Sequence, residues 1–234
     1  EYTQICMLTA EAAILRALEV KGYKADVTAG LSLGEYGALI ACGALSRKDA
    51  FALVRKRGIY MQEAVPEGGA MAAVLALDTA QIEEACKKTE GIVSIANYNC
   101  PGQIVITGEE KAVAAAGELC KEAGAKRVVS LKVSGPFHSA MLKGAGEKLG
   151  EELKHVTVHT PAIPYVANVT ADYVTKEEEI KPLLEKQVSS SVRWQQTIER
   201  LIADGADKFV EIGPGKTLTG FNIFGSFVIL QISF

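Results

Sequence analysis

The sequence predicts an α/β protein in which a ferredoxin-like unit is inserted into a larger domain built on a parallel sheet. Helical and strand patterns of apolar residues alternate along the 234 residues, and the chain is 48% hydrophobic and 23% charged, as is typical of globular α/β domains. The middle of the chain has the strand, helix, strand, strand, helix, strand order of a split βαβ unit. We therefore expect an insertion at 67–133 within a domain formed by 1–66 and 134–234.

Local signals define the elements of the N-terminal part. Residues 3–20 are rich in Ala and Leu, contain no Gly or Pro, and end at Lys21-Gly22, a normal helix stop. Ser46 and Asp49 stand three residues apart ahead of the run "AFALVRKR", which indicates a capping box. These signals predict a strand at 25–30 and helices at 3–20, 35–44 and 47–64.

The expected insertion and the C-terminal part follow from the same patterns. Within the insertion we expect helices at 79–89 and 109–124 and strands at 70–77, 91–98, 102–108 and 126–133. Residues 99–101 connect its second and third strands. Beyond a turn at 134–141 we expect a helix to about Leu153, helices at 177–187 and 192–204, and strands at 162–170 and 207–213.

A serine lies where the first predicted strand meets the following helix. Gly30, Ser32 and Gly34 form G-x-S-x-G, the pattern of a nucleophile elbow, in which two glycines without Cβ atoms let strand and helix approach closely. The N–H of Leu33, the next residue, is then expected to point at a developing oxyanion. The alternative is a glycine-rich turn without chemistry, but the strand and helix on either side favour the nucleophile.

A nucleophilic serine needs a base, and the chain has three histidines. His138 lies in a Gly-Pro turn after a predicted strand, where active-site loops gather. We predict it as the partner of Ser32, with a purely structural role as the alternative. His155 and His159 share one face of a predicted strand in "KHVTVHT"; lacking a third ligand, they indicate solvent-facing residues rather than a metal site.

Arg57 lies on the apolar face of the helix predicted at 47–64. A guanidinium on a buried face is unfavourable unless it is paired. Either an internal carboxylate pairs with Arg57, or Arg57 lines a cavity for an anionic ligand, because its planar fork suits a bidentate grip on a carboxylate. From this pattern alone both alternatives stay open.

Bulk properties exclude several classes of function. The net charge of −3 and pI near 5.8 argue against a nucleic-acid-binding surface. Five scattered cysteines without C-x-x-C predict neither a disulfide framework nor a zinc site and favour the cytoplasm. The turn "EIGPGK" lacks the full phosphate-loop spacing and is expected to be structural. The apolar tail "GFNIFGSFVILQISF" is too short to span a bilayer.

Five stretches together resemble the malonyl-CoA:acyl carrier protein transacylase family. They occur in the family's order from about residue 3 to 221 and read "LSLGEY", "RKRGIYMQEAVPEG", "NYNCPGQIVITG", "VSGPFHSAM" and "KFVEIGPGKTLTGF". The resemblance implies an α/β-hydrolase-like core with a ferredoxin-like insertion, in agreement with the organisation above. It also implies an acyltransferase of fatty acid biosynthesis, which moves a malonyl group from malonyl-CoA to the phosphopantetheine thiol of acyl carrier protein.

The resemblance assigns roles to single residues. Ser32 matches the nucleophile that carries the malonyl ester, His138 the general base, and Arg57 the arginine that holds the free malonyl carboxylate. Gln187 matches the residue whose backbone carbonyl orients the histidine, and Asn99 lies in a loop that borders the family's site. No metal or redox cofactor is implied. The expected partners of a monomeric protein are malonyl-CoA and acyl carrier protein, without nucleic acid or membrane.

The sequence departs from the family pattern in three places. Leu31 stands where the family usually has His before the nucleophile, so a polar contact is lost. The family's N-terminal strand and G-Q-G-x-Q loop, which supplies a second oxyanion-hole donor, are not in this sequence, and we expect a rate lower by roughly 10²–10³-fold. The tail "SFVILQISF" differs from the family's charged ending, and we expect it to pair in place of the missing strand.

Two other functions stay open on the sequence. A serine esterase or thioesterase needs the same Ser32 and His138 with water as the acceptor, although Arg57 on the cavity face argues against a neutral ester. A chain that only docks a carrier protein, without forming an acyl-serine, is the other alternative.

Overall fold

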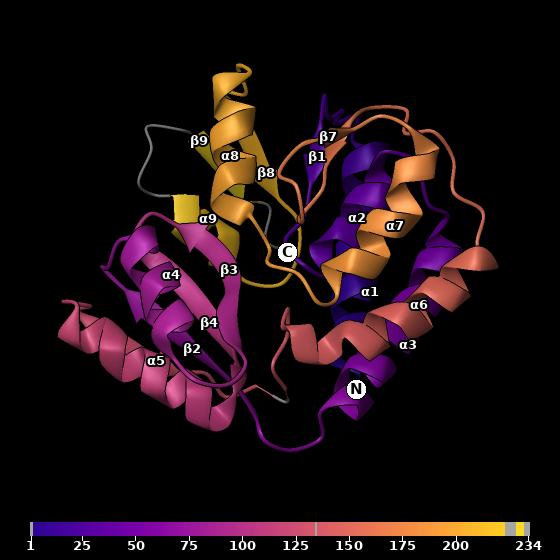
Figure 1. Ribbon diagram of the computed structural model, residues 1–234. Coiled ribbons are helices and arrows are strands. Elements are labelled where there is room, and N and C mark those ends of the chain that lie inside the picture. The colour runs from indigo at the N-terminus through magenta and orange to yellow at the C-terminus, as the bar shows by residue number, and fades with distance from the viewer. Residues whose placement is uncertain (1, 134, 223–227, 232–234) are drawn as a thin grey trace.

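The computed structural model describes residues 2–133, 135–222 and 228–231. Figure 1 shows α4, α5 and strands β2 to β4 on one side of the molecule and α1, α2, α3, α6 and α7 packed together on the other. The elements, in chain order, are α1 (Thr3–Val20), β1 (Thr28–Ala29), α2 (Gly34–Ala41), α3 (Arg47–Ala64), β2 (Gly69–Leu75), α4 (Thr79–Lys88), β3 (Val93–Cys100), β4 (Gln103–Glu109), α5 (Glu110–Glu122), β5 (Arg127–Ser130), the 3-10 turn η1 (Ala140–Leu142), α6 (Lys143–Lys154), β6 (Tyr165–Val166), β7 (Tyr173–Val174), α7 (Glu177–Gln187), α8 (Trp194–Ala203), β8 (Lys208–Glu211), α9 (Thr217–Asn222) and β9 (Val228–Gln231).

Helix α3 begins and ends where the sequence predicts. The Ser46 hydroxyl accepts a hydrogen bond from the Asp49 N–H at 3.0 Å, so the expected N-terminal cap is present. The buried residues of α3 recur at helical spacing and include Arg57 among apolar neighbours. Because α3 packs against α1 and α6, its Arg57 face lies inside the molecule.

The middle of the chain forms the predicted ferredoxin-like sheet. Its strand order is β3-β4-β2-β5 with antiparallel neighbours throughout, as expected for a split βαβ unit. These strands and their helices lie between Gly69 and Ser130, while the domain boundaries at 67 and 133 stay a prediction. Strand β3 continues to Cys100, so Pro101 and Gly102, with φ 74° at Gly102, form a shorter turn than expected.

The two faces of this sheet carry separate apolar clusters. Ile82, Ile104 and Ile106 belong to the cluster that α4 and α5 cover. Met71, Ala73, Ala96 and Val105 form a second cluster, which packs against Phe137. Phe137 also packs against the other hydrophobic core, to which α1, α2, α3, α6 and α7 contribute. The residue before His138 is therefore fixed between the two halves of the molecule.

A small mixed sheet has the strand order β1-β6-β7. β1 pairs in parallel with β6, matching Thr28 with Tyr165, and β6 pairs antiparallel with β7. The strand predicted at 162–170 is thus reduced to two residues, and β7 was not predicted. From Ala167 onward, the residues of that apolar run form the connection between β6 and β7 instead of extending the strand.

The strand predicted in "KHVTVHT" is wrong. Helix α6 continues to Lys154, and His155 is its C-terminal cap. Beyond it, Val158 forms an isolated antiparallel bridge with Leu45, and the His159 N–H donates to the Ala44 carbonyl at 2.9 Å, so this segment adds a single bridge where the sequence predicts a strand. His155 and His159 are exposed, as expected of solvent-facing residues.

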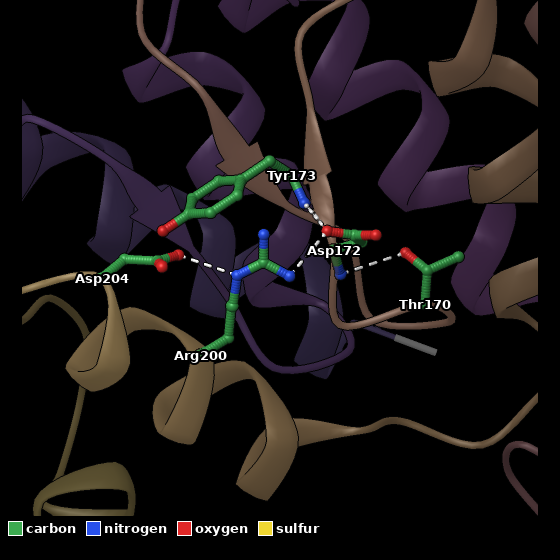
Figure 2. A network of polar contacts seen from close by, with 5 residues as sticks. All are labelled: Thr170, Asp172, Tyr173, Arg200 and Asp204. Atoms are coloured by element: carbon green, nitrogen blue, oxygen red, sulfur yellow. Dashed lines mark hydrogen bonds and ion pairs between the residues drawn. The ribbon is translucent and has the colours of Figure 1, made fainter.

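A polar network joins α8 to the β6–β7 hairpin (Figure 2). The Arg200 guanidinium donates to Asp204 at 2.8 Å and to Asp172 at 3.1 Å, and it lies over the Tyr173 ring. Thr170 accepts a hydrogen bond from the Asp172 N–H. These contacts between largely exposed side chains join α8 to the connection between β6 and β7.

The C-terminal elements form a two-stranded sheet and a short helix. β8 pairs in parallel with β9, which is the described part of the expected tail strand; the other tail residues lie outside the described residues. Glu211 accepts hydrogen bonds from the N–H groups of Leu218 and Thr219. This carboxylate occupies the N-terminus of α9, so "EIGPGK" is the structural turn that the sequence predicts. None of the described helices is long and apolar enough to cross a membrane.

Candidate active site

Ser32 occupies a strained turn between β1 and α2. Its φ of 53° lies in the left-handed region, which is unfavourable for a residue with a Cβ. A Cβ on Gly30 would lie 2.0 Å from the Gly34 carbonyl oxygen, so glycine is required at position 30. A Cβ on Gly34 would meet nothing within 4 Å. The prediction that both glycines permit the close approach is therefore correct for Gly30 and wrong for Gly34.

Ser32 and His138 form a hydrogen-bonded pair. The Ser32 Oγ and His138 Nε2 are 2.8 Å apart, although the two residues are far apart in sequence. The His138 Nδ1 lies 3.0 Å from the Gln187 carbonyl oxygen and 3.1 Å from that of Ser190. Because carbonyl oxygens only accept, Nδ1 carries the proton and Nε2 is left to accept the hydroxyl proton.

Burial lowers the pKa of His138 and so favours its neutral form. Desolvation, together with the positive charge of Arg57, lowers the pKa of His138 to about 4, against the opposing effect of the two carbonyl hydrogen bonds. The imidazole is therefore uncharged near pH 7. The backbone of His138, with a φ of 59°, also lies in the left-handed region, so packing must enforce the conformations of both His138 and Ser32.

The backbone N–H groups beside Ser32 differ in their availability. The Ser32 N–H donates to the Asn168 Oδ1 at 2.6 Å. Among the described residues, nothing accepts a hydrogen bond from the Leu33 N–H, which lies at the N-terminal end of α2. This geometry leaves the Leu33 N–H as the available donor next to the Ser32 hydroxyl. The Leu31 carbonyl accepts from the Gly34 N–H at 2.9 Å, so leucine at this position keeps the turn intact.

Arg57 is 2% exposed and directly contacts the candidate nucleophile. Its NH2 donates to the Ser32 Oγ at 3.0 Å and to the Gln187 Oε1 at 3.1 Å, and its NH1 donates to the Gln4 Oε1 at 2.5 Å. All three acceptors are neutral. Within the described ranges no carboxylate lies at ion-pair distance from this guanidinium, so the first alternative left by the sequence, a directly paired arginine, is not what the structure has.

A buried carboxylate, that of Glu35, is linked to the Arg57 guanidinium through the side chain of Gln187. The Gln187 Nε2 donates to the Glu35 Oε2 at 2.6 Å and to the Ser32 carbonyl at 2.9 Å, while its Oε1 faces Arg57. Burial raises the pKa of Glu35 to about 7, opposed by hydrogen bonds from Gln187 and Asn168 and by the charge of Arg57. Gln187 therefore acts through its side chain as well as through its carbonyl.

The structure brings together five of the six predicted site residues, namely Ser32, Leu33, Arg57, His138 and Gln187. Asn99 is the exception: it is 7% exposed within β3 instead of lying in a loop, and among the described residues it makes no hydrogen bond to the other five. The loop placement is wrong because β3 is longer than its apolar pattern indicates, while the substrate-binding role of Asn99 stays a prediction.

Four residues of the site were not predicted, namely Gln4, Glu35, Asn168 and Ser190. Gln4 stands one turn before the buried Leu8 of α1, Glu35 lies in the otherwise apolar α2, and Asn168 interrupts the run "YVANV". A polar residue within an apolar pattern was the available signal for these three. Ser190 contributes a backbone carbonyl, for which no side-chain signal exists.

Comparison with known proteins identifies the family. A model of the acyl transferase domain matches residues 1–223. The malonyl CoA-acyl carrier protein transacylase of Bacillus subtilis is 50% identical over 221 residues, which are 93% of this chain and 70% of that protein. This chain belongs to the malonyl-CoA:acyl carrier protein transacylase family.

Solved structures of the transacylase family share the fold. An acyl carrier protein S-malonyltransferase from Vibrio cholerae superimposes with a TM-score of 0.95 at 42% identity, covering 98% of this chain and 77% of that one. A malonyl-transacylase in complex with its type II polyketide synthase acyl-carrier protein also gives 0.95, at 43% identity, covering 98% and 76%. The predicted α/β fold class is confirmed by these transacylase structures.

Proposed function

We propose that this chain transfers the malonyl group of malonyl-CoA to the phosphopantetheine thiol of acyl carrier protein through a malonyl ester on Ser32. The observation that carries the proposal is the Arg57 guanidinium, buried 3.0 Å from the Ser32 Oγ with neutral hydrogen-bond partners. A buried cation at this distance suits an acyl group that bears its own carboxylate. The family membership supports the same substrate.

In the first half-reaction, we propose that Ser32 attacks the thioester carbonyl. The Ser32 hydroxyl gives its proton to the His138 Nε2, which lies 2.8 Å away. The new oxyanion accepts a hydrogen bond from the Leu33 N–H, and the positive charge of Arg57 favours the developing negative charge. The carbon–sulfur bond then breaks, and the CoA sulfur takes the proton from His138.

In the second half-reaction, the same groups act in the opposite order. His138 accepts the proton of the pantetheine thiol, whose sulfur attacks the malonyl-Ser32 ester, and the proton returns to the Ser32 oxygen when the ester bond breaks. The Gln187 and Ser190 carbonyls stabilise the imidazolium through its Nδ1–H in both halves. Both steps are acyl exchanges without net oxidation, so the proposed mechanism requires no metal or redox cofactor.

The proposal places the protein in the cytoplasm as a monomer. Its five cysteines, four of them buried, are all free thiols, as is typical of a reducing compartment. Burial also raises the pKa of Cys42, Cys86, Cys100 and Cys120. These thiols are therefore unreactive and do not compete with Ser32 for acyl groups.

Mass spectrometry of the intact protein tests the proposal. After incubation with malonyl-CoA, the wild-type chain should gain the mass of one malonyl group, and Ser32→Ala should gain none. Addition of holo-acyl carrier protein should then remove the group and transfer it to the carrier. Release by water at the same rate without the carrier would instead indicate a thioesterase, and binding of the carrier without an acyl-enzyme would indicate a docking protein.

A further inference from the structure

We infer that Asn168 is a positioning residue that holds the Ser32 elbow in its reactive conformation; the inference rests on the proposed role of Ser32 as the nucleophile. Asn168 follows β6 and is 2% exposed. Among the hydrogen bonds of the described residues, none joins Asn168 to the imidazole or to the guanidinium. Its side chain instead bonds to the backbone on both sides of Leu31, at the Gly30 carbonyl and the Ser32 N–H.

The Asn168 carboxamide uses both of its ends on the elbow. Its Oδ1 accepts the Ser32 N–H at 2.6 Å, and its Nδ2 donates to the Gly30 carbonyl oxygen at 2.6 Å. An amide is the side chain that presents an acceptor and a donor side by side, as these two backbone groups require. The contact therefore fixes the chain between Gly30 and Ser32 from outside the elbow.

This contact is placed where the backbone is strained. Ser32 has a φ of 53°, a conformation that persists in a residue with a Cβ only when its surroundings enforce it. Asn168 holds the Ser32 N–H, and the Gln187 Nε2 holds the Ser32 carbonyl at 2.9 Å. Both peptide groups of the nucleophile are thus held by amide side chains from the C-terminal half of the chain.

Asn168 is itself held through its backbone. Its N–H donates to the Glu35 Oε2 at 3.3 Å, and its carbonyl accepts from the Arg193 N–H at 2.9 Å. The hairpin that carries it is joined to α8 through Arg200 (Figure 2). The Glu35 Oε2 also accepts a hydrogen bond from the Gln187 Nε2, so one buried carboxylate bonds to both residues whose side-chain amides hold the elbow.

The same contact selects the oxyanion donor. With its N–H committed to Asn168, Ser32 does not offer that N–H to a substrate, and the Leu33 N–H next to it stays available. Loss of the Asn168 carboxamide would free the Ser32 N–H and let the turn relax, which moves the hydroxyl relative to the His138 Nε2. A displacement near 1 Å in such a pair lowers the rate by roughly 10²-fold.

The test measures the reactivity of Ser32 in the full chain with two reagents. Asn168→Ala removes both contacts, and Asn168→Asp keeps the acceptor for the Ser32 N–H but loses the donor for the Gly30 carbonyl. Each variant is mixed with malonyl-CoA and, separately, with a fluorophosphonate probe that labels active serines. Quenched samples give two values, the rate constant of Ser32 modification and the fraction of protein modified at completion.

A matched control separates positioning from general destabilisation. Thr197, in α8, is 2% exposed and donates to the Arg193 carbonyl at 2.9 Å, and no hydrogen bond joins it to the elbow within the described ranges. Thr197→Ala removes a buried hydrogen bond in the same region and is expected to keep the wild-type rate constant. Asn168→Ala is expected to lower the rate constant for both reagents by roughly 10²-fold at an undiminished final fraction, with Asn168→Asp between it and the wild type.

Each outcome decides the inference. A wild-type rate constant in Asn168→Ala, whether the final fraction is full or reduced, would overturn it, because Asn168 would then only stabilise the fold. The malonyl-CoA concentration for half-maximal rate should not change, since Asn168 does not touch Arg57. A wild-type chain that reacts with the fluorophosphonate but gains no malonyl group would refute the proposed function while leaving the role of Asn168 measurable.

Discussion

Replacement of Arg57 by Ala should abolish the preference of this chain for malonyl-CoA over acetyl-CoA. In the wild type, a malonyl group on Ser32 brings a carboxylate to a guanidinium whose NH2 is 3.0 Å from the Ser32 Oγ. An acetyl group leaves the same buried cation with neutral partners only. The two substrates therefore differ in one charge-assisted contact, which Arg57→Ala removes.

The magnitude follows from the one charge-assisted hydrogen bond that the malonyl carboxylate adds. A hydrogen bond to a charged group contributes roughly 1.5–3 kcal/mol, and each 1.4 kcal/mol corresponds to about tenfold in rate or affinity. The expected preference of the wild type in kcat/KM is therefore roughly 10- to 100-fold, and it should fall to about onefold in Arg57→Ala. Burial lowers the pKa of Arg57 but leaves the guanidinium protonated at neutral pH, so the contact is ionic under assay conditions.

The assay compares acylation of Ser32 by malonyl-CoA and acetyl-CoA in the same preparation. The ratio of the two kcat/KM values cancels any general loss of activity, including the loss of the Arg57 bond to Ser32 itself. Arg55→Ala is the matched control, because Arg55 lies on the same helix but stacks on the Tyr2 ring, away from the nucleophile. A malonyl preference that survives in Arg57→Ala would refute the assignment of the buried guanidinium to the substrate carboxylate.

Three further predictions concern stability and pH. Gly30→Ala should lower the free energy of unfolding by about 3 kcal/mol or more, because the new Cβ would lie 2.0 Å from the Gly34 carbonyl oxygen, whereas Gly34→Ala should change it by less than about 1 kcal/mol; urea denaturation measures both. The pKa of His138 is lowered from 6.5 to about 4, so the neutral imidazole contributes fully to the free energy of unfolding above pH 6.5. This contribution is lost as the pH falls toward 4, by about 3 kcal/mol in total. The free energy of unfolding measured against pH should show this loss in the wild type and not in His138→Gln. The pKa of Glu35 is raised from 4.5 to about 7, so the protonated carboxyl contributes fully to the free energy of unfolding below pH 4.5, and this contribution is lost as the pH rises through 7. A wild-type free energy of unfolding that does not fall relative to that of Glu35→Gln over this range would contradict the prediction.

Local patterns determined the elements and the reacting groups. The cap formed by Ser46 and Asp49 set the start of α3, and the helical period placed Arg57 on the buried face. The glycine and serine spacing between β1 and α2 defined the elbow, and the scarcity of histidines pointed to His138. These predictions succeeded because caps, helical periodicity and turn chemistry act over a few residues of the chain.

Tertiary structure decided how those groups are held. The amides of Asn168 and Gln187 reach Ser32 from 136 and 155 residues away, and Gln4 reaches Arg57 from 53 residues away. The sequence marks such residues at most as polar positions in apolar runs, and a bond between two of them exists only after packing has brought their elements together. The same reason explains the errors at "KHVTVHT" and Asn99: whether an extended segment joins a sheet, and where a strand stops, depends on which neighbour lies beside it.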